Sequence, residues 1–171
     1  MDWLTRQTAT CGEGAAIFQV GSQITPSDSY LGTLRRGAFV AEALKAFAPD
    51  LALTRQQLNS APVIERFVAR EEPQAANRRP SERTYLKVAI CLVREQPNLA
   101  TRLVWADPVT TSTSAIQATM VENARHCVGN VRRVVVDRYE FRTYIADALY
   151  RWTLAARGVA TLIPDDRSEA G

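Results

Sequence analysis

The stretch VENARHCVGNVRRVVVDRYEFRTYIADALYRW, residues 121–152, is the part of the chain that decides the expected fold. It joins a long segment with helical spacing and several arginines to an aromatic segment that ends at Trp152. The block contains no nucleophile paired with a base and no metal-ligand spacing. An arginine-bearing helix followed by an apolar aromatic segment suits a protein that binds a polyanion and packs against copies of itself.

The composition is that of an ordinary globular protein with an unusual choice of basic residue. The 171 residues are 46% hydrophobic and 23% charged, which is long and apolar enough for one domain with a core. Only two of the 21 basic residues are lysines, Lys45 and Lys87. Arginine pairs bidentately with phosphate, so the bias favours nucleic acid binding. A coding sequence rich in G and C is the alternative explanation.

The cysteines and the N-terminus bear on where the protein works. Cys11, Cys91 and Cys127 are odd in number and lack metal-ligand spacing, which predicts free thiols in a reducing compartment, no metal and no cofactor. The first residues do not resemble a secretory signal, and no run of 18 apolar residues predicts a membrane span. The chain is therefore expected to be cytosolic.

Helical periodicity runs through most of the first hundred residues. Residues 1–26 are expected to form an arm with a short strand or turn. Helices are expected at 28–48, stopped by Pro49, and from a Thr54 cap to just before Pro73, with a kink or restart at Pro62. A polar loop at 73–83 then leads to a helix at 81–94, although a buried strand at 86–93 fits the same apolar run.

The last part of the chain is expected to hold the longest helix. That helix spans about 111–136, and an aromatic helix follows near 140–157, closed by Gly158. Residues 159–171 are expected to be a mobile tail. The predicted fold is all-α, a four-helix bundle with a short terminal helix and minor β-strands as an option, in one domain at 1–158.

Catalysis is poorly supported by the residue types present. His126 is the single histidine, and its neighbour Cys127 faces a different direction on a helix, so a Cys–His pair is not expected. The sequence CGEG at 11–14 lacks the lysine and the preceding strand of a phosphate loop. These observations predict a protein that is not an enzyme.

Arginines and aromatic side chains are the remaining candidates for function. Each arginine could equally be a solvated surface residue, and binding is favoured only where several converge. The aromatic residues could complete the core of one chain, form a belt between neighbouring subunits, or do both. They are Tyr139, Phe141, Tyr144, Tyr150 and Trp152.

A pattern of residues from 54 to 152 points to a known family. Its last part comprises Glu122, Asn123-Ala124, Val131-Arg132, Phe141 and Trp152. Upstream, it comprises Pro80-Ser81, Tyr85, Leu92-Val93, Pro97 and Ala100, preceded by Thr54-Arg55-Gln56-Gln57 and the run Val63 to Phe67. This pattern resembles coat proteins of rod-shaped plant RNA viruses, the tobacco mosaic virus-like group that includes the benyviruses.

The resemblance implies two pairs of helices and polymerisation into a helical rod around single-stranded viral RNA, in the virion and the host cytoplasm. RNA contacts are then expected at Arg55, Gln57, Ser60, Arg102 and Asn123. Phe141 and Trp152 would pack between subunits. The acidic residues that drive disassembly in the group have no clear counterparts, and Glu71-Glu72 and Glu95 are the nearest candidates.

A buried ion pair between Arg94 and Glu122 is a further expectation from the resemblance. The group commonly has an arginine at the position of Glu122, so the pair would have its charges exchanged. Deleting one partner of a buried pair costs about 3–5 kcal/mol, so reversing both charges should be tolerated better than either single change.

The sequence thus predicts a structural capsid protein that binds RNA without reading bases. The alternative is a small helical protein of a bacterium or phage that binds nucleic acid or a partner helix. An enzyme on a helical scaffold is the weakest option.

Overall fold

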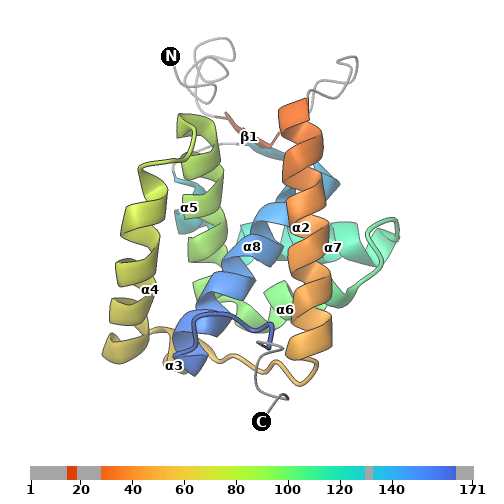
Figure 1. Ribbon diagram of the computed structural model, residues 1–171. Coiled ribbons are helices and arrows are strands. Elements are labelled where there is room, and N and C mark those ends of the chain that lie inside the picture. Colours follow the sequence, from red (N-terminus) through yellow and green to blue (C-terminus); the bar gives the residue numbers. More distant parts are fainter. Residues whose placement is uncertain (1–14, 19–27, 130–132, 165–171) are drawn as a thin grey trace.

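The computed structural model describes residues 15–18, 28–129 and 133–164 (Figure 1). Within these ranges the chain is all-α apart from two short strands, as the sequence predicts. The helices are α2 (Asp28–Phe47), α3 (Arg55–Leu58), α4 (Ala61–Ala75), α5 (Pro80–Glu95), α6 (Pro97–Trp105), α7 (Thr111–Asn123) and α8 (Arg138–Arg157), with a 3₁₀ turn, η1 (Arg125–Val128).

Helix α8 lies at the centre of the molecule. It contacts α2 and α5 most extensively and also packs against α4, α6 and α7. Figure 1 shows it crossing between α5 and α2. The other helices therefore surround one central helix, and the predicted four-helix bundle is not confirmed.

The composition of α8 explains its position. It is buried around its whole circumference from Phe141 to Ala155, with only a few partly exposed side chains. Most of its buried side chains are apolar or small, and the inward polar groups of Asp147 and Thr153 have hydrogen-bond partners on the helix itself. Small residues such as Ala146 and Ala148 also let neighbouring helices approach closely, and Gly37 of α2 lies directly against Thr143.

Several predicted helix ends are confirmed by their capping contacts. The Thr54 hydroxyl accepts from the Gln57 backbone N–H at 3.1 Å, as expected for an N-cap. The helix restarts after Ser60 with Pro62 in its first turn, where the missing N–H costs little. Gly158 adopts the left-handed conformation, φ +68°, that ends α8.

The predicted long helix at 111–136 is wrong. Helix α7 stops at Asn123, η1 follows, and Gly129 takes a positive φ of +77° that interrupts any helix. Arg133–Val136 then forms strand β2, which pairs in parallel with β1, Ala15–Phe18. The valine run fits a strand better than a helix because β-branched side chains lose rotamer freedom in helices.

The structure differs from several other predicted elements. The apolar run at 86–93 is helical, so the strand alternative is wrong. Pro73 lies inside α4 rather than beyond it, and α6 was not predicted. Part of the predicted tail folds back, since Leu162 joins the core and its N–H donates to the Tyr150 hydroxyl at 3.5 Å.

No helix among the described residues is long and apolar enough to cross a membrane.

Candidate functional site

Three of the predicted RNA contacts lie together around α3. Arg55 and Gln57 are exposed, and the Ser60 hydroxyl donates to the Gln57 carbonyl at 2.8 Å. The Arg55 guanidinium, 65% exposed, pairs with Glu95 at 2.5 Å, at the end of α5. Arg55 therefore presents its charge to solvent while one of its nitrogens is held by a carboxylate.

The other two predicted contacts lie on different helices. Arg102 is exposed in the last turn of α6, and Asn123 is exposed at the end of α7. No hydrogen bond or ion pair within the described ranges joins either of them to the residues around α3. The contacts of the described residues thus link Arg55, Gln57 and Ser60 within one short segment and do not link Arg102 or Asn123 to it.

The prediction that Phe141 and Trp152 pack between subunits is wrong, because both side chains are buried inside one molecule. Phe141 is 1% exposed and Trp152 is 2% exposed, both within the core of a single molecule. The Trp152 ring stacks on Phe67 at 3.9 Å between centroids, and its N–H donates to the Ile90 carbonyl at 3.1 Å. An aromatic residue so enclosed has no surface to offer a neighbour.

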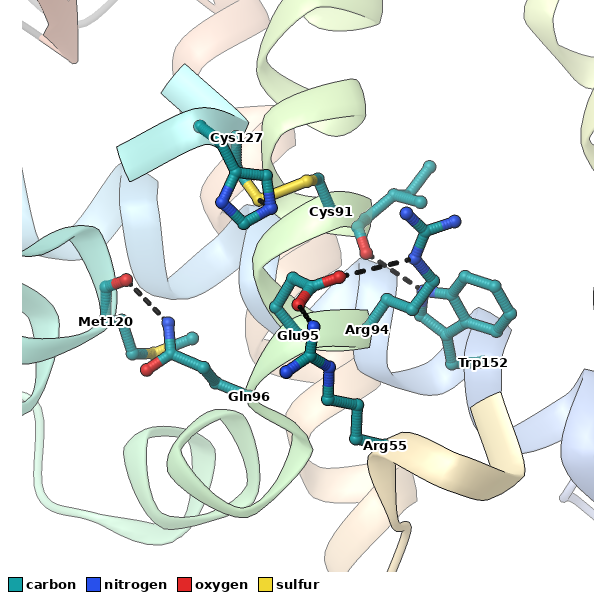
Figure 2. The surroundings of a disulfide bond; sticks show 10 residues. Arg55, Cys91, Arg94, Glu95, Gln96, Met120, Cys127 and Trp152 are labelled. Carbon is teal, nitrogen blue, oxygen red and sulfur yellow. Dashed lines mark hydrogen bonds and ion pairs between the residues drawn. A yellow bond between two sulfur atoms is a disulfide. The ribbon is translucent and has the colours of Figure 1, made fainter. Parts of the chain in front are cut away.

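The predicted buried pair of Arg94 and Glu122 is also wrong. The Glu122 side chain is 73% exposed and lies 3.5 Å from Arg125 on the same segment. Arg94 instead approaches Glu95 at 3.9 Å, so that Glu95 lies between Arg94 and Arg55 (Figure 2). Arg94 is the chain neighbour of Glu95 at the end of α5, and Arg55 reaches the same carboxylate from the start of α3.

Much of the arginine content has a structural role. Arg66, Arg142 and Arg157 each donate to carbonyl groups in the last turn of another helix. Arg66 reaches Ala155 at 2.7 Å, Arg142 reaches Val104 at 2.5 Å, and Arg157 reaches Phe47 at 3.2 Å. These carbonyls lack helical partners and carry the negative end of the helix dipole, which a guanidinium satisfies.

Arg142 illustrates how burial affects the charge of such an arginine. Its side chain is partly buried against the end of α6, where its Nε also donates to Leu103 at 3.3 Å. Burial lowers the pKa of Arg142, while the carboxylates of Glu42 and Asp107 oppose that shift. The group nonetheless stays charged, because an arginine titrates far above neutral pH.

A second group of arginines forms an ion-pair network beside a cavity of about 550 Å³. Arg151 contacts Asp147 at 2.9 Å, Gln74 at 2.7 Å, and Glu71. Arg78 binds the other oxygen of Glu71 at 2.9 Å. Burial would lower the pKa of Arg151, but Asp147 and Glu71 raise it overall. Glu71 and Glu95, candidates for a disassembly switch, are both bound to arginines.

The cysteines depart most from the sequence prediction. Cys91 of α5 and Cys127 of η1 form a disulfide with Cα atoms 5.6 Å apart (Figure 2), so the expectation of free thiols is wrong for this pair. Cys11 lies outside the described residues. The Cys127 sulfur lies 3.6 Å from Nε2 of His126.

This cluster was missed because its signal is spatial. Cys91 and Cys127 are 36 residues apart, and neither belongs to a motif such as C-x-x-C. In the predicted continuous helix at 111–136, the adjacent side chains of His126 and Cys127 would also point in different directions. A predicted break at Gly129 would have been the one available clue.

Comparison of the chain with protein families, with curated proteins and with solved structures finds no match.

Proposed function

We propose that this chain is a structural, non-enzymatic subunit that binds single-stranded RNA and assembles with copies of itself, as the coat proteins it resembles do. The proposal is supported by how the described arginines divide. Arg66, Arg142 and Arg157 bind carbonyls of the chain itself. Arg102 is exposed, and Arg55 keeps 65% of its side chain exposed beside Glu95. Arg102 can meet a phosphate directly, and Arg55 can do so with the part of its guanidinium that Glu95 leaves exposed.

Binding would be electrostatic and independent of base sequence. Arg55 and Arg102 would neutralise phosphates, and Gln57, Ser60 and Asn123 would donate hydrogen bonds to the backbone. A net charge of +3 keeps each subunit soluble while many subunits neutralise a long strand. Affinity should therefore fall steeply as salt rises.

Assembly requires apolar surface that one chain leaves uncovered. Helix α2 carries the most exposed phenylalanine of the described residues, Phe39 at 64%, together with Leu31 at 37% and Phe47 at 39%. Lateral burial of such side chains contributes about 25 cal/mol per Å² before the entropic cost of association. We assign the exposed side of α2 around Phe39 to contact between copies, in place of Phe141 and Trp152.

The RNA part is tested by fluorescence anisotropy with a labelled single-stranded oligonucleotide over a series of salt concentrations. Arg55→Gln with Arg102→Gln should weaken binding and reduce the slope of log affinity against log salt by roughly 2. Arg83→Gln with Arg138→Gln is the matched control, because it also removes two exposed arginines and leaves α2 unchanged. Equal slopes for the two double variants would contradict the proposed site.

The assembly part is tested by negative-stain microscopy of protein with and without RNA. Rods or stacked discs are expected for the unmodified chain and should be lost in Phe39→Glu. Val109→Glu, at a side chain that is 63% exposed, is the control that should still assemble. A compact particle that saturably binds duplex DNA would instead favour a small DNA-binding protein.

A further inference from the structure

Three side chains with metal-binding atoms converge where η1 packs on α5. They are Cys91, His126 and Cys127, and their ligand atoms all lie within 4.8 Å of one another. Cys91 and Cys127 are partly buried, and His126 is exposed. The cluster is therefore anchored on the core at one side and open to solvent at the other.

The spacing of these atoms suits a tetrahedral metal ion once the disulfide is open. With Zn–S near 2.3 Å and Zn–N near 2.05 Å, a tetrahedral site places sulfur and nitrogen ligands about 3.6 Å apart. Cys127 Sγ and His126 Nε2 are already 3.6 Å apart. Rotation of the cysteine side chains can separate the two sulfurs to the roughly 3.8 Å that the same site requires.

We propose that Cys91, Cys127 and His126 form a zinc site when the disulfide is reduced, so that the same two sulfurs alternate between a disulfide and a metal-bound state. A thiol reductant supplies two electrons and two protons, which break the S–S bond and give two thiols while the reductant forms its own disulfide. Zinc then displaces the two thiol protons, and two Zn–S bonds form.

The chemistry of the donors selects the metal. Two thiolates and an imidazole suit Zn²⁺, and three protein ligands leave a fourth position for water. Two thiolates, one neutral imidazole and Zn²⁺ sum to zero charge, so nearby arginines do not repel the complex.

The disulfide excludes the metal because neither sulfur carries the negative charge of a thiolate, and the thiolate is the form of cysteine that binds a metal. A disulfide oxidant takes two electrons from the two thiolates and is itself reduced to two thiols, so the S–S bond forms again and zinc is released. Reduction by a thiol allows zinc to bind again. Glu95 does not complete the site, because its carboxylate is engaged by Arg55 and Arg94.

The test uses the full chain, reduced and freed of reductant without oxygen, and titrated with Co²⁺ and then Zn²⁺. One Co²⁺ per chain is expected, with the visible bands of tetrahedral cobalt and a thiolate charge-transfer band that zinc removes. The oxidised chain should bind none. Cys11→Ser is the matched control, because it removes a cysteine and keeps all three proposed ligands.

The variants and a chemical readout make the outcome decisive. Cys91→Ser and Cys127→Ser should lose the charge-transfer band, and His126→Ala, at an exposed position, should bind about ten-fold or more weakly. Zinc should also protect Cys91 and Cys127 from alkylation in the unmodified chain, as read by mass spectrometry. Absence of this protection, or metal binding by Cys91→Ser equal to that of Cys11→Ser, overturns the proposal.

Discussion

Trp152 is held from two sides within one molecule. Its ring stacks on Phe67 of α4, and its N–H donates to the Ile90 carbonyl of α5, so one side chain joins three helices. Buried tryptophan usually finds such a partner for its N–H, because an unpaired donor would be costly. Its contribution to stability is therefore expected even when the protein is monomeric.

Replacing Trp152 tests this placement. Trp152→Ala should lower the free energy of unfolding by about 3–5 kcal/mol, because it removes a large ring and leaves a cavity. Urea unfolding followed by circular dichroism at low protein concentration measures the change. Tyr139→Ala, at a 43% exposed ring on the same helix, should cost about 0.5 kcal/mol or less. Equal losses would place Trp152 outside the core.

Glu140 should make stability depend on pH. Burial, with a smaller effect of Asp137, raises the pKa of Glu140 from 4.5 to about 7. The folded state then holds this proton more tightly than the unfolded chain. The stabilisation is fully present below the unfolded pKa and is lost as the pH rises through 7.

Glu140→Gln isolates that contribution because glutamine stays neutral. The urea midpoint of the unmodified chain should fall, relative to that of Glu140→Gln, between about pH 5 and about pH 8. The two proteins should have similar midpoints at the lower pH. If the urea midpoints of the two proteins changed in parallel over this pH range, the Glu140 carboxylate would be well solvated in the folded protein.

At the scale of elements, the crossing of α2 and α8 depends on one missing side chain. A Cβ atom on Gly37 would lie 2.5 Å from both Cγ2 and Oγ1 of Thr143. Atoms cannot approach so closely, so any larger residue must push the two helices apart. The most extensive helix contact of the described chain thus requires glycine at this position.

Two alanine substitutions in α2 should change stability in opposite directions. Gly37→Ala should destabilise the protein by about 1–3 kcal/mol, because overpacking outweighs the gain in helix propensity. Gly32→Ala, where nothing lies within 4 Å of the new Cβ, should stabilise it by roughly 0.5–1 kcal/mol. Thermal and urea unfolding measure both, and a stabilising Gly37→Ala would show that the helices are not in close contact.

Some helices could be predicted from local sequence signals, whereas the strand pairing could not. Local signals predicted α2, α5 and α8, because capping residues and prolines act on their own neighbours. The end of α7 was missed because the valine run from Val134 satisfies a helical stripe as well as a strand. Its pairing with Ala15–Phe18 is non-local and leaves no trace in periodicity.

The same distinction applies to the candidate site. Arg55 and Arg102 are exposed, which is expected both for RNA contacts and for solvated surface residues, so their role stays a prediction. The burial of Phe141 and Trp152 could not be decided, since an aromatic helix can dock on its own chain or on a neighbour. The convergence of Cys91 with His126 required the tertiary fold.

For the molecule as a whole, the disulfide links two distant parts of the chain. Cys91 and Cys127 enclose a segment that contains α6 and α7, with a sequence separation of 36. Closing a loop of that length in the unfolded chain contributes about 4 kcal/mol to stability in the chain-entropy estimate. Reduction should therefore weaken the entire fold and not only η1.

A reductant, with a chelator present to exclude metal, should lower the urea midpoint of the unmodified chain and of Cys11→Ser. The double variant Cys91→Ala with Cys127→Ala should show no response, because it has no bond to break. A midpoint that does not respond to reductant in the unmodified chain would show that the bond does not constrain the unfolded state.

The central position of α8 has a consequence for how the protein is made. The helices that surround it precede it in the sequence, so a ribosome synthesises the outer layer before the helix around which that layer packs. Until Phe141 to Ala155 have emerged, the nascent chain exposes the apolar faces of α2 and α5 with nothing to cover them. Folding should consequently be completed late in translation, and a chain that stalls before α8 becomes a substrate for chaperones or proteases.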